Sequence, residues 1–562
     1  MPCQGKSKLA LEHRGRWFVG FVPELQSFLR KKANVLKWMA CGAVVAFFTW
    51  RVALMYLPGQ GLTYFVEFGE KEHARYLPEV KAANHYEMPG SDGYDGWSYV
   101  QIAMRPNLAD PALGKAVFGL PYRARRILFL WTAWLLGGGD PVRVMNAYAA
   151  QNIICWYLLA WLLFRWLPPI SWGNCARWAA VLFSFGLIVS VRSALLDGPS
   201  LLLIATGILL AESKRPWMAA AVLGISGLGK DTNILGALGL DLPDRASRRT
   251  WLPWLARMAL VVLPLGVWAA CLAAWIGNGA DVGARNFSGP FCGIAGKAEE
   301  IVSTLIADSR AEDAVIRYDL FDLLVAGGLL TQFFFFASRI RWRDPWWRVG
   351  AGYAFLMAFL GDSVWEGYPS AAARVLLPMT LAFNVLVPKR GWWPVLLIAG
   401  NLGVLASFDV LKPPYREACV VQDTHGLRTN PSNGDRVEGN YGPRNWFGPK
   451  KSRFQFGRWS RGECEVSVRN PQPFPIVADV SFHVRSADAR HASVSLGSKV
   501  LWGADLVPGD MKRVTLTGLV LSPGDTVLVF QSDRPASYPD AVDRRKVTFF
   551  VWNLEIDLKQ RR

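Results

Sequence analysis

A dense group of polar and ionisable residues lies between positions 85 and 126 of this 562-residue chain. Two acids, Asp92 and Asp95, stand at its centre, and the residues around them are His85, Tyr94, Trp97, Arg123, Arg125 and Arg126. A carboxylate such as Asp95 can act as general base on a hydroxyl while nearby arginines neutralise a phosphate leaving group. Two other interpretations stay open: Ser-Asp-Gly-Tyr-Asp-Gly is also typical of a solvated turn, and the arginines could anchor lipid headgroups.

Three further segments carry ionisable residues at the ends of apolar runs. They are Ser-Ala-Leu-Leu-Asp197-Gly-Pro-Ser, Gly-Lys230-Asp231-Thr, and the segment from Asp362 through Glu366 to Arg374. Asp197 could be a helix N-cap, and Lys230 with Asp231 could be a local charge pair. Charges near a bilayer face are nonetheless a functional hypothesis. We expect all three segments to emerge on the same side of the membrane as Asp95 and to converge there.

The elements that must position these residues are membrane helices. Hydrophobic residues make up 52% of the chain, and they cluster in runs long enough, or nearly so, to cross a bilayer as helices: 36–57, 144–163, 251–276, 320–337, 371–387 and 392–408. Many of the 26 tryptophans stand at the ends of these runs, as side chains at the headgroup level do. This pattern predicts an α-helical polytopic protein of the cytoplasmic (inner) membrane.

Basic residues set the expected topology. The segment 1–35 is expected in the cytoplasm because of Arg30, Lys31, Lys32 and Lys37. If the later basic turns are also cytoplasmic, the chain crosses the membrane about eleven times over 36–410. A large first outer loop then covers 58–142, in which 127–136 is too short to span and is expected to be interfacial or re-entrant. The crossing at 232–240 is the weakest. Although the net charge is +18, the lysines and arginines lie between apolar runs, which argues against nucleic-acid binding.

The character of the chain changes after Asp409. A linker over 411–450 is rich in Pro, Gly and Asn, and alternating apolar and polar residues then predict short strands at 464–468, 477–484, 493–496, 514–516, 526–531 and 548–554. This spacing indicates an all-β sandwich over 451–562, periplasmic or extracellular because the preceding span runs outward. Cys419 and Cys464 would share that oxidising compartment, where they could pair.

The layout and short motifs resemble the GT-C superfamily of polytopic glycosyltransferases. The resemblance covers about residues 36–410 and is carried by Tyr94-Asp95-Gly-Trp97-Ser-Tyr, by Pro121-Tyr-Arg123-Ala-Arg125-Arg126-Ile-Leu, and by Asp197-Gly. Such enzymes take a sugar from a polyprenyl phosphate or pyrophosphate on the outer side, with an acidic residue in the first outer loop. The resemblance implies that Asp95 is that residue, and that Asp197 matches a second acidic position of some members.

The resemblance and the residues together predict an inverting glycosyltransferase with a lipid-phosphate sugar donor and a cell-surface glycan, lipid or protein acceptor. The candidate catalytic residues are Asp95, Asp92 and Asp197; the candidate donor-phosphate ligands are Arg123, Arg125, Arg126, Lys230 and Arg374; and the candidate substrate-binding residues are Tyr94, Trp97, His85, Asp231 and Glu366. Some members carry Asp-x-Asp, but here two residues separate the acids. This departure leaves a divalent metal doubtful, and no other cofactor is expected.

Two other classes of protein fit part of the pattern. A transporter or flippase of a lipid-linked saccharide would also have many spans, but no internal repeat relates the halves, and the charges lie at span ends instead of mid-bilayer. A surface-assembly protein that uses its spans only as an anchor would not need eleven.

Overall fold

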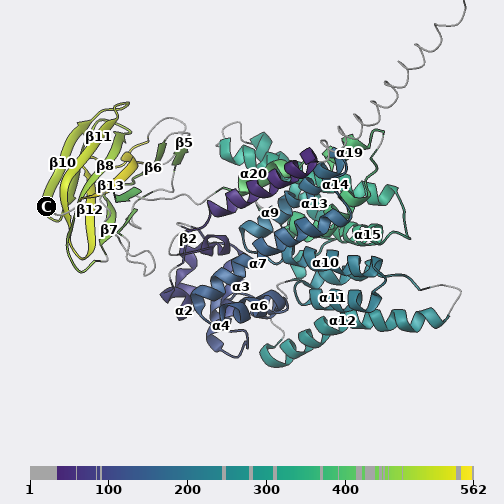
Figure 1. Ribbon diagram of the computed structural model, residues 1–562. Coiled ribbons are helices and arrows are strands. Elements are labelled where there is room, and N and C mark those ends of the chain that lie inside the picture. Colours follow the sequence, from purple (N-terminus) through teal and green to yellow (C-terminus); the bar gives the residue numbers. More distant parts are fainter. Residues whose placement is uncertain are drawn as a thin grey trace, which may run out of the picture.

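The computed structural model describes residues 35–57, 60–83, 85–88, 91–243, 248–277, 283–307, 313–367, 371–389, 391–412, 420–423, 437–441, 446, 450–452, 455–470, 472–538 and 546–559. Helices make up the structure as far as residue 410, and extended strands dominate from residue 420 onward. Figure 1 shows the long strands gathered in a unit of their own beside the helices. Cys419 lies outside the described residues, and so does the segment 1–34.

Five helices are long and apolar enough to cross a membrane. They are Val35–Ala53, Pro141–Arg165, Arg249–Ile276, Asp319–Ser338 and Trp393–Val410. A sixth span is formed if α8 (Trp172–Leu182) and α9 (Phe185–Arg192), which meet at a bend of 43°, count as one. The chain is thus an integral membrane protein with five or six candidate spans in its described part, fewer than the eleven expected from charge.

Two of the expected crossings have a different local structure. The run 371–387 is broken at Leu376 into α17 (Ala372–Val375) and α18 (Leu377–Leu386), and Pro378 stands in the first turn of α18, where its missing N–H costs nothing. The stretch 232–240 falls in η4 (Asp231–Gly239), a 3₁₀ helix. Two glycines and one asparagine among its nine residues favour this tighter, irregular path over a spanning helix.

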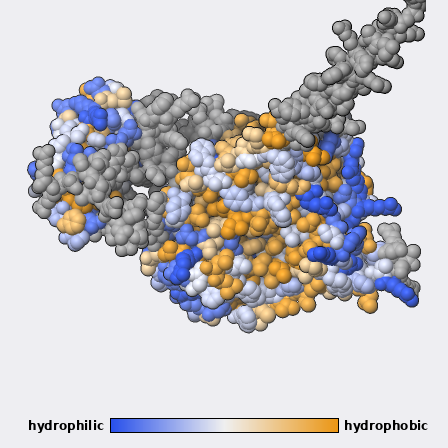
Figure 2. Space-filling view, in the orientation of Figure 1, coloured by the Kyte–Doolittle hydropathy of each residue, from blue (hydrophilic) through white to orange (hydrophobic). Residues whose placement is uncertain are grey.

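The outside of the helical part is apolar. Many large hydrophobic side chains are between 55% and 75% exposed, among them Trp38, Leu136, Trp161, Leu252 and Phe334. Figure 2 shows hydrophobic residues spread over the helical face that it presents. Exposed apolar surface of this extent would be unfavourable in water, whereas hydrocarbon accommodates it.

The segment between the first helix and α7 consists of short elements, and it is called the outer segment here because the charge pattern predicts that it is an outer loop. They are η1 (Thr63–Val66), β1 (Phe68–Gly69), η2 (Glu70–Arg75), α2 (Pro78–Ala82), β2 (Glu87–Met88), α3 (Asp95–Met104), α4 (Pro111–Ala116), α5 (Leu120–Ala124) and α6 (Leu128–Gly137). The stretch expected to be interfacial or re-entrant is indeed a short helix, α6, and it packs on α7.

The remaining helical elements follow in sequence. They are α7 (Pro141–Leu162), η3 (Leu163–Arg165), α8, α9, α10 (Asp197–Glu212), α11 (Pro216–Gly227), η4, α12 (Arg248–Ile276), η5 (Ala284–Asn286), α13 (Cys292–Ala307), α14 (Asp313–Ser338), α15 (Pro345–Ala358), α16 (Asp362–Trp365), α17, α18, α19 (Trp393–Ala399) and α20 (Val404–Val410). An Asp-Pro pair starts α4, α7 and α15: the aspartate side chain accepts a backbone N–H of the first turn, and proline occupies N1.

The C-terminal strands form two mainly antiparallel sheets whose apolar faces share one core. The strands are β3 (Val420–Asp423), β4 (Glu438–Tyr441), β5 (Lys450–Ser452), β6 (Gln455–Trp459), β7 (Cys464–Asn470), β8 (Ile476–Ser486), β9 (Arg490–Leu496), β10 (Lys499–Leu506), β11 (Lys512–Leu521), β12 (Gly524–Ser532) and β13 (Phe549–Lys559). One sheet has the order β10-β9-β12-β7-β4, and the other β11-β8-β13-β6-β5 with β3 beside β13. Val466 and Phe530 from the first sheet and Val480 and Phe482 from the second belong to one buried cluster.

Candidate active site

Asp95 is the first residue of α3, and tight backbone packing holds that end of the helix. A Cβ on Gly96 would lie 2.6 Å from the carbonyl oxygen of Val66 and 2.7 Å from that of Ser193. Gly93 has φ +73°, and a Cβ there would likewise be too close to the carbonyl oxygen of Glu67. Glycine is therefore required at both positions. The turn that carries Asp95 therefore packs closely against η1 and the end of α9.

The Asp95 carboxylate pairs with an arginine of the same outer segment. Arg123 Nη2 donates to Asp95 Oδ1 at 2.6 Å, and the Asp95 side chain is 37% exposed. Arg123 Nη1 also donates to the carbonyl of Phe118, while its Nε is buried and has no hydrogen-bond partner among the described residues. The sequence-predicted base and one predicted phosphate ligand are thus in direct contact.

Asp197 joins three segments that are distant in sequence. It is the first residue of α10 and is buried, and its two carboxylate oxygens pair with Lys230 Nζ and, at 3.1 Å, with Arg374 Nη1. Arg374 Nη2 in turn donates to the Tyr94 hydroxyl at 2.9 Å, next to Asp95. A buried carboxylate between two cations is well compensated, and it holds their positions relative to one another. Asp197 therefore fixes Lys230 and Arg374 at one place beside the outer loop.

Arg126 is held by three partners at once. Its Nε lies 3.1 Å from Asp231 Oδ1, and its two terminal nitrogens donate to the hydroxyls of Tyr99 and Tyr122, both at 2.7 Å. Burial raises the pKa of Tyr99 to about 12, so this phenol stays neutral and does not cancel the charge of Arg126. Four of the five predicted phosphate ligands thus form ion pairs with Asp95, Asp197 and Asp231; they are Arg123, Arg126, Lys230 and Arg374. This group of seven residues is called the ion-pair layer.

The other predicted site residues make their contacts elsewhere. Asp92 is exposed and pairs with Lys71 at 3.2 Å; Glu366 is exposed and pairs with Arg285 at 3.1 Å; and Arg125 is exposed. Trp97 is buried against Tyr76, and His85 lies 2.9 Å from Glu87. The structure does not bring these five residues into the ion-pair layer. No three His, Cys, Asp or Glu side chains among the described residues are grouped to hold a metal ion.

Glu67 belongs beside the site although the sequence analysis did not select it. Its carboxylate lies 3.0 Å from Arg192 Nη1, whose guanidinium stacks over Tyr64 at 3.8 Å. Burial raises the pKa of Glu67, an effect that the positive charges of Arg192 and Arg374 oppose. The available signal was a single acid inside the apolar run Tyr-Phe-Val-Glu-Phe, because a buried acid requires a partner.

A large groove reaches the layer from the side of the outer segment. Its volume is about 1330 Å³, and α4, α5 and the C-terminal half of α12 form its walls. Tyr122 and Arg125 line it, and the Tyr122 hydroxyl accepts hydrogen bonds from Arg126 and, at 3.0 Å, from Asn286. Tyr122 is therefore the link between this groove and Arg126.

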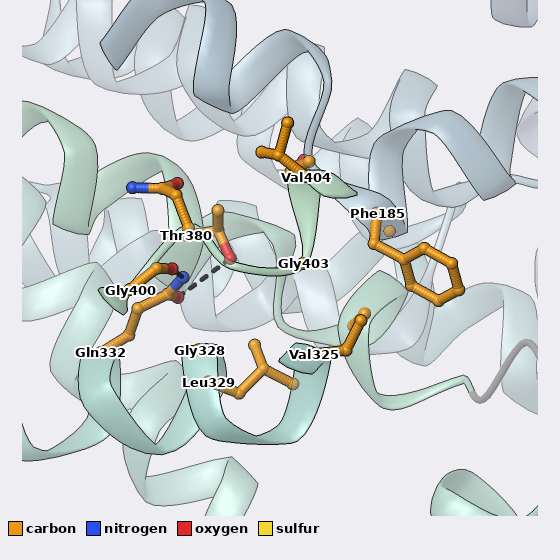
Figure 3. Close-up of a pocket in the computed structure, with 13 residues that line it drawn as sticks. Phe185, Val325, Gly328, Leu329, Gln332, Thr380, Gly400, Gly403 and Val404 are labelled. Atoms are coloured by element: carbon orange, nitrogen blue, oxygen red, sulfur yellow. Dashed lines mark hydrogen bonds between the residues drawn. The ribbon is translucent and has the colours of Figure 1, made fainter. Parts of the chain in front are cut away.

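A small cavity lies between α9, α14 and residues 400–404. It has a volume of about 30 Å³, room for one or two water molecules, and Gly186 and Ala373 are among its lining residues. Thr380 Oγ1 donates to Gln332 Oε1 at 2.9 Å, and Gln332 Nε2 donates to the Gly400 carbonyl at 2.7 Å (Figure 3). These bonds stabilise the interrupted helices that carry Arg374.

No protein-family model and no curated protein matches the chain. Among solved structures, the arabinosyltransferase EmbB from Mycobacterium smegmatis, determined by single-particle cryo-EM, aligns with 93% of this chain at 11% identity and a TM-score of 0.33. The alignment covers 64% of the EmbB chain, so this chain spans less than two thirds of that protein.

Proposed function

We propose that the chain is a membrane glycosyltransferase that moves a sugar from a polyprenyl-phosphate donor to a glycan, lipid or protein acceptor on the outer side of the cytoplasmic membrane. The observation that supports this proposal is the layer of ion pairs. Asp95 pairs in it with Arg123 of α5, and the other three cations are Arg126 between α5 and α6, Lys230 directly before η4, and Arg374 of α17. A layer assembled from such separate segments is suited to binding a charged headgroup.

The chemistry follows from the charges. Asp95 takes the proton of the acceptor hydroxyl as the acceptor oxygen attacks the anomeric carbon. The bond from that carbon to the phosphate oxygen breaks, and the phosphate leaves with the electron pair and one more negative charge. Attack from the face opposite the leaving group inverts the anomeric configuration. Arg126, Lys230 and Arg374 stabilise the leaving phosphate through charge-assisted hydrogen bonds.

The charge balance favours a monophosphate donor. Within the layer, Arg123, Arg126, Lys230 and Arg374 face the carboxylates of Asp95, Asp197 and Asp231, which leaves an excess of one positive charge. A sugar linked through one phosphate is a diester with one negative charge, and it neutralises that excess. A pyrophosphate-linked sugar has two negative charges and would leave one uncompensated in a largely buried site.

The test is a donor panel. The purified full chain in sealed lipid vesicles is incubated with polyprenyl-monophosphate and polyprenyl-pyrophosphate sugars and a cell-envelope extract as acceptor, and the freed polyprenyl phosphate or polyprenyl pyrophosphate is measured by mass spectrometry. We expect sugar-dependent release from a monophosphate donor only. Movement of intact donor across the bilayer without release would favour the flippase alternative, and an absence of both would contradict the proposed function.

A further inference from the structure

The ion pair between Arg123 and Asp95 raises a question about the order of events at the proposed site. The carboxylate oxygen that Arg123 Nη2 contacts at 2.6 Å belongs to the group that must accept the proton of the acceptor. An arginine N–H and a hydroxyl compete for that oxygen, and the guanidinium also neutralises the charge that attracts the proton. While Arg123 holds Asp95, one of its two oxygens is occupied and its charge is partly neutralised, so Asp95 is less able to act as base than after Arg123 has left.

Arg123 differs from the other cations of the layer in how it is held. Arg126 has one carboxylate and two phenol partners, while Lys230 and Arg374 share the buried Asp197. Arg123 has a single carboxylate partner, Asp95, whose side chain is more than one third exposed, whereas the Asp197 side chain that Lys230 and Arg374 share is 5% exposed. Of the four cations, Arg123 thus gives up least when it changes partner.

The local backbone allows such a change. Arg123 stands in α5, a helix of only five residues that follows Gly119, whose φ is +64°. Its Nη1 donates to the carbonyl of Phe118, one residue before that glycine. This bond can remain while the opposite edge of the guanidinium turns from Asp95 to a new acceptor. The planar fork of arginine suits a phosphate, which accepts two N–H groups side by side.

Resting on the proposed function, we propose that Arg123 exchanges partners: it holds Asp95 while the site is empty and moves to the donor phosphate when the donor binds. Asp95 is then released as a base only after the donor is in place. The acceptor hydroxyl gives its proton to Asp95, which becomes neutral, and the departing phosphate gains one negative charge. One unit of negative charge thus moves from Asp95 to the phosphate, and Arg123 lies within reach of both.

This exchange has two consequences. Donor binding precedes productive acceptor activation, so water and acceptor are not activated in an empty site. Arg123 also contributes more in the transition state than before it, because its new partner gains charge while its old partner loses charge; this is differential binding.

The test is a cryo-EM structure of the full chain in nanodiscs with farnesyl phosphate, a prenyl monophosphate, at pH 5, where this monoester carries about one negative charge like the diester donor. We expect a phosphate oxygen within hydrogen-bond distance of the Arg123 guanidinium, and the contact between Nη2 and Asp95 Oδ1 to be open. A phosphate held by Arg126, Lys230 and Arg374 while Arg123 remains on Asp95 would overturn the exchange and leave the proposed function standing. Absence of farnesyl phosphate from the layer would overturn both.

Kinetics of two substitutions give an independent measurement with the donor found in the panel. Arg123→Gln should lower kcat about 10²-fold, the scale for losing one transition-state donor. Arg123→Lys should recover part of the rate, because it keeps the charge and loses the fork. The control is Arg143→Gln, since Arg143 is exposed at the start of α7 and pairs only loosely, at 3.5 Å, with Asp140. Rates equal to the control in both Arg123 variants would contradict the exchange.

Discussion

At the residue scale, the chemistry of this chain depends on how carboxylates and cations are paired. Asp197 is buried between Lys230 and Arg374, so removing any one of the three leaves a buried charge without its partner. Asp95 has one partner and remains partly exposed. Of the three acids that the sequence analysis grouped as catalytic, Asp197 is thus the one that we propose positions cations, and Asp95 is the one that we propose reacts once Arg123 has left it.

Substitution of Arg374 tests this division. Its two terminal nitrogens reach Asp197 and Tyr94, and a lysine can place only one ammonium there. We expect Arg374→Lys to lower the transfer rate about tenfold and Arg374→Ala about 10²-fold, with a raised apparent KM for the donor in normally inserted protein. Donor-dependent rates normalised to folded protein provide the measurement. If the Arg374 variants insert poorly but keep the parent's dependence of rate on donor concentration, Arg374 would instead be an anchor for lipid headgroups.

At the element scale, close backbone contacts place the site residues. Gly186, in the first turn of α9, lies against α17: a Cβ there would be 2.2 Å from the Ala373 carbonyl oxygen and 2.8 Å from the Arg374 nitrogen. Interrupted helices therefore bring Arg374 to Asp197, and a straight helix over 371–387 would not make this contact in the same way.

Gly186→Ala should separate α9 from α17. The expected cost is about 1–3 kcal/mol of stability from overpacking, together with a loss of transfer activity larger than the loss of folded protein, because Arg374 moves. Thermal unfolding in detergent and the transfer rate are measured together. Gly42→Ala is the matched control, since a Cβ at Gly42 in the first helix meets nothing within 4 Å. Equal effects of the two substitutions would contradict this account of the helix contact.

The stability of the outer segment should depend on pH through the carboxylate of Glu79. Arg105 holds both oxygens of its carboxylate, at 2.7 and 2.8 Å, and these hydrogen bonds lower the pKa of Glu79. A lowered folded-state pKa stabilises the protein above the unfolded pKa of about 4.3, and this stabilisation is lost as the pH falls through the folded value. At pH 7, Glu79→Gln should therefore lower the free energy of unfolding by about 1 kcal/mol, and the variant should unfold at a lower temperature than the parent.

The difference between parent and Glu79→Gln should shrink as the pH falls from 5 toward 3. Unfolding temperatures of both proteins in detergent, measured across that range, check this expectation. A difference that stays constant with pH would mean that the ion pair is not its source.

At the scale of the whole molecule, the sequence predicted the membrane part and the β-domain, because each depends on local pattern, and it selected most of the residues that form the ion-pair layer. Five of six apolar runs match candidate spans, and the alternating runs match β7, β8, β9, β11, β12 and β13. The strands β3, β4, β5, β6 and β10 were not predicted; in β10 only one of the eight side chains is buried, so apolar and polar residues do not alternate there. Glu67 was missed because the single acid in its apolar run shows only that a partner is needed, and the tertiary contact with Arg192 identifies that partner.

The orientation of the molecule remains a prediction from charge, and it can be checked directly. Lys389 and Arg390 are expected to hold the turn before the last span in the cytoplasm, which sends the β-domain outside. Protease added to intact spheroplasts should therefore remove the β-domain, and the fragments are identified by mass spectrometry. Loss of the domain only after lysis would place it inside and reverse the side on which Asp95 acts.

The central claim is that Asp95 is the base of a transfer reaction from a lipid phosphate, and Asp95→Asn tests it most directly. The amide keeps the size of the side chain and loses the base, so we expect a rate at least about 10²-fold below the parent, with farnesyl phosphate still bound by the folded protein. Asp92→Asn, at an exposed position, should cost less. Small and equal effects of the two substitutions would contradict the claim and favour a solvated turn at this position.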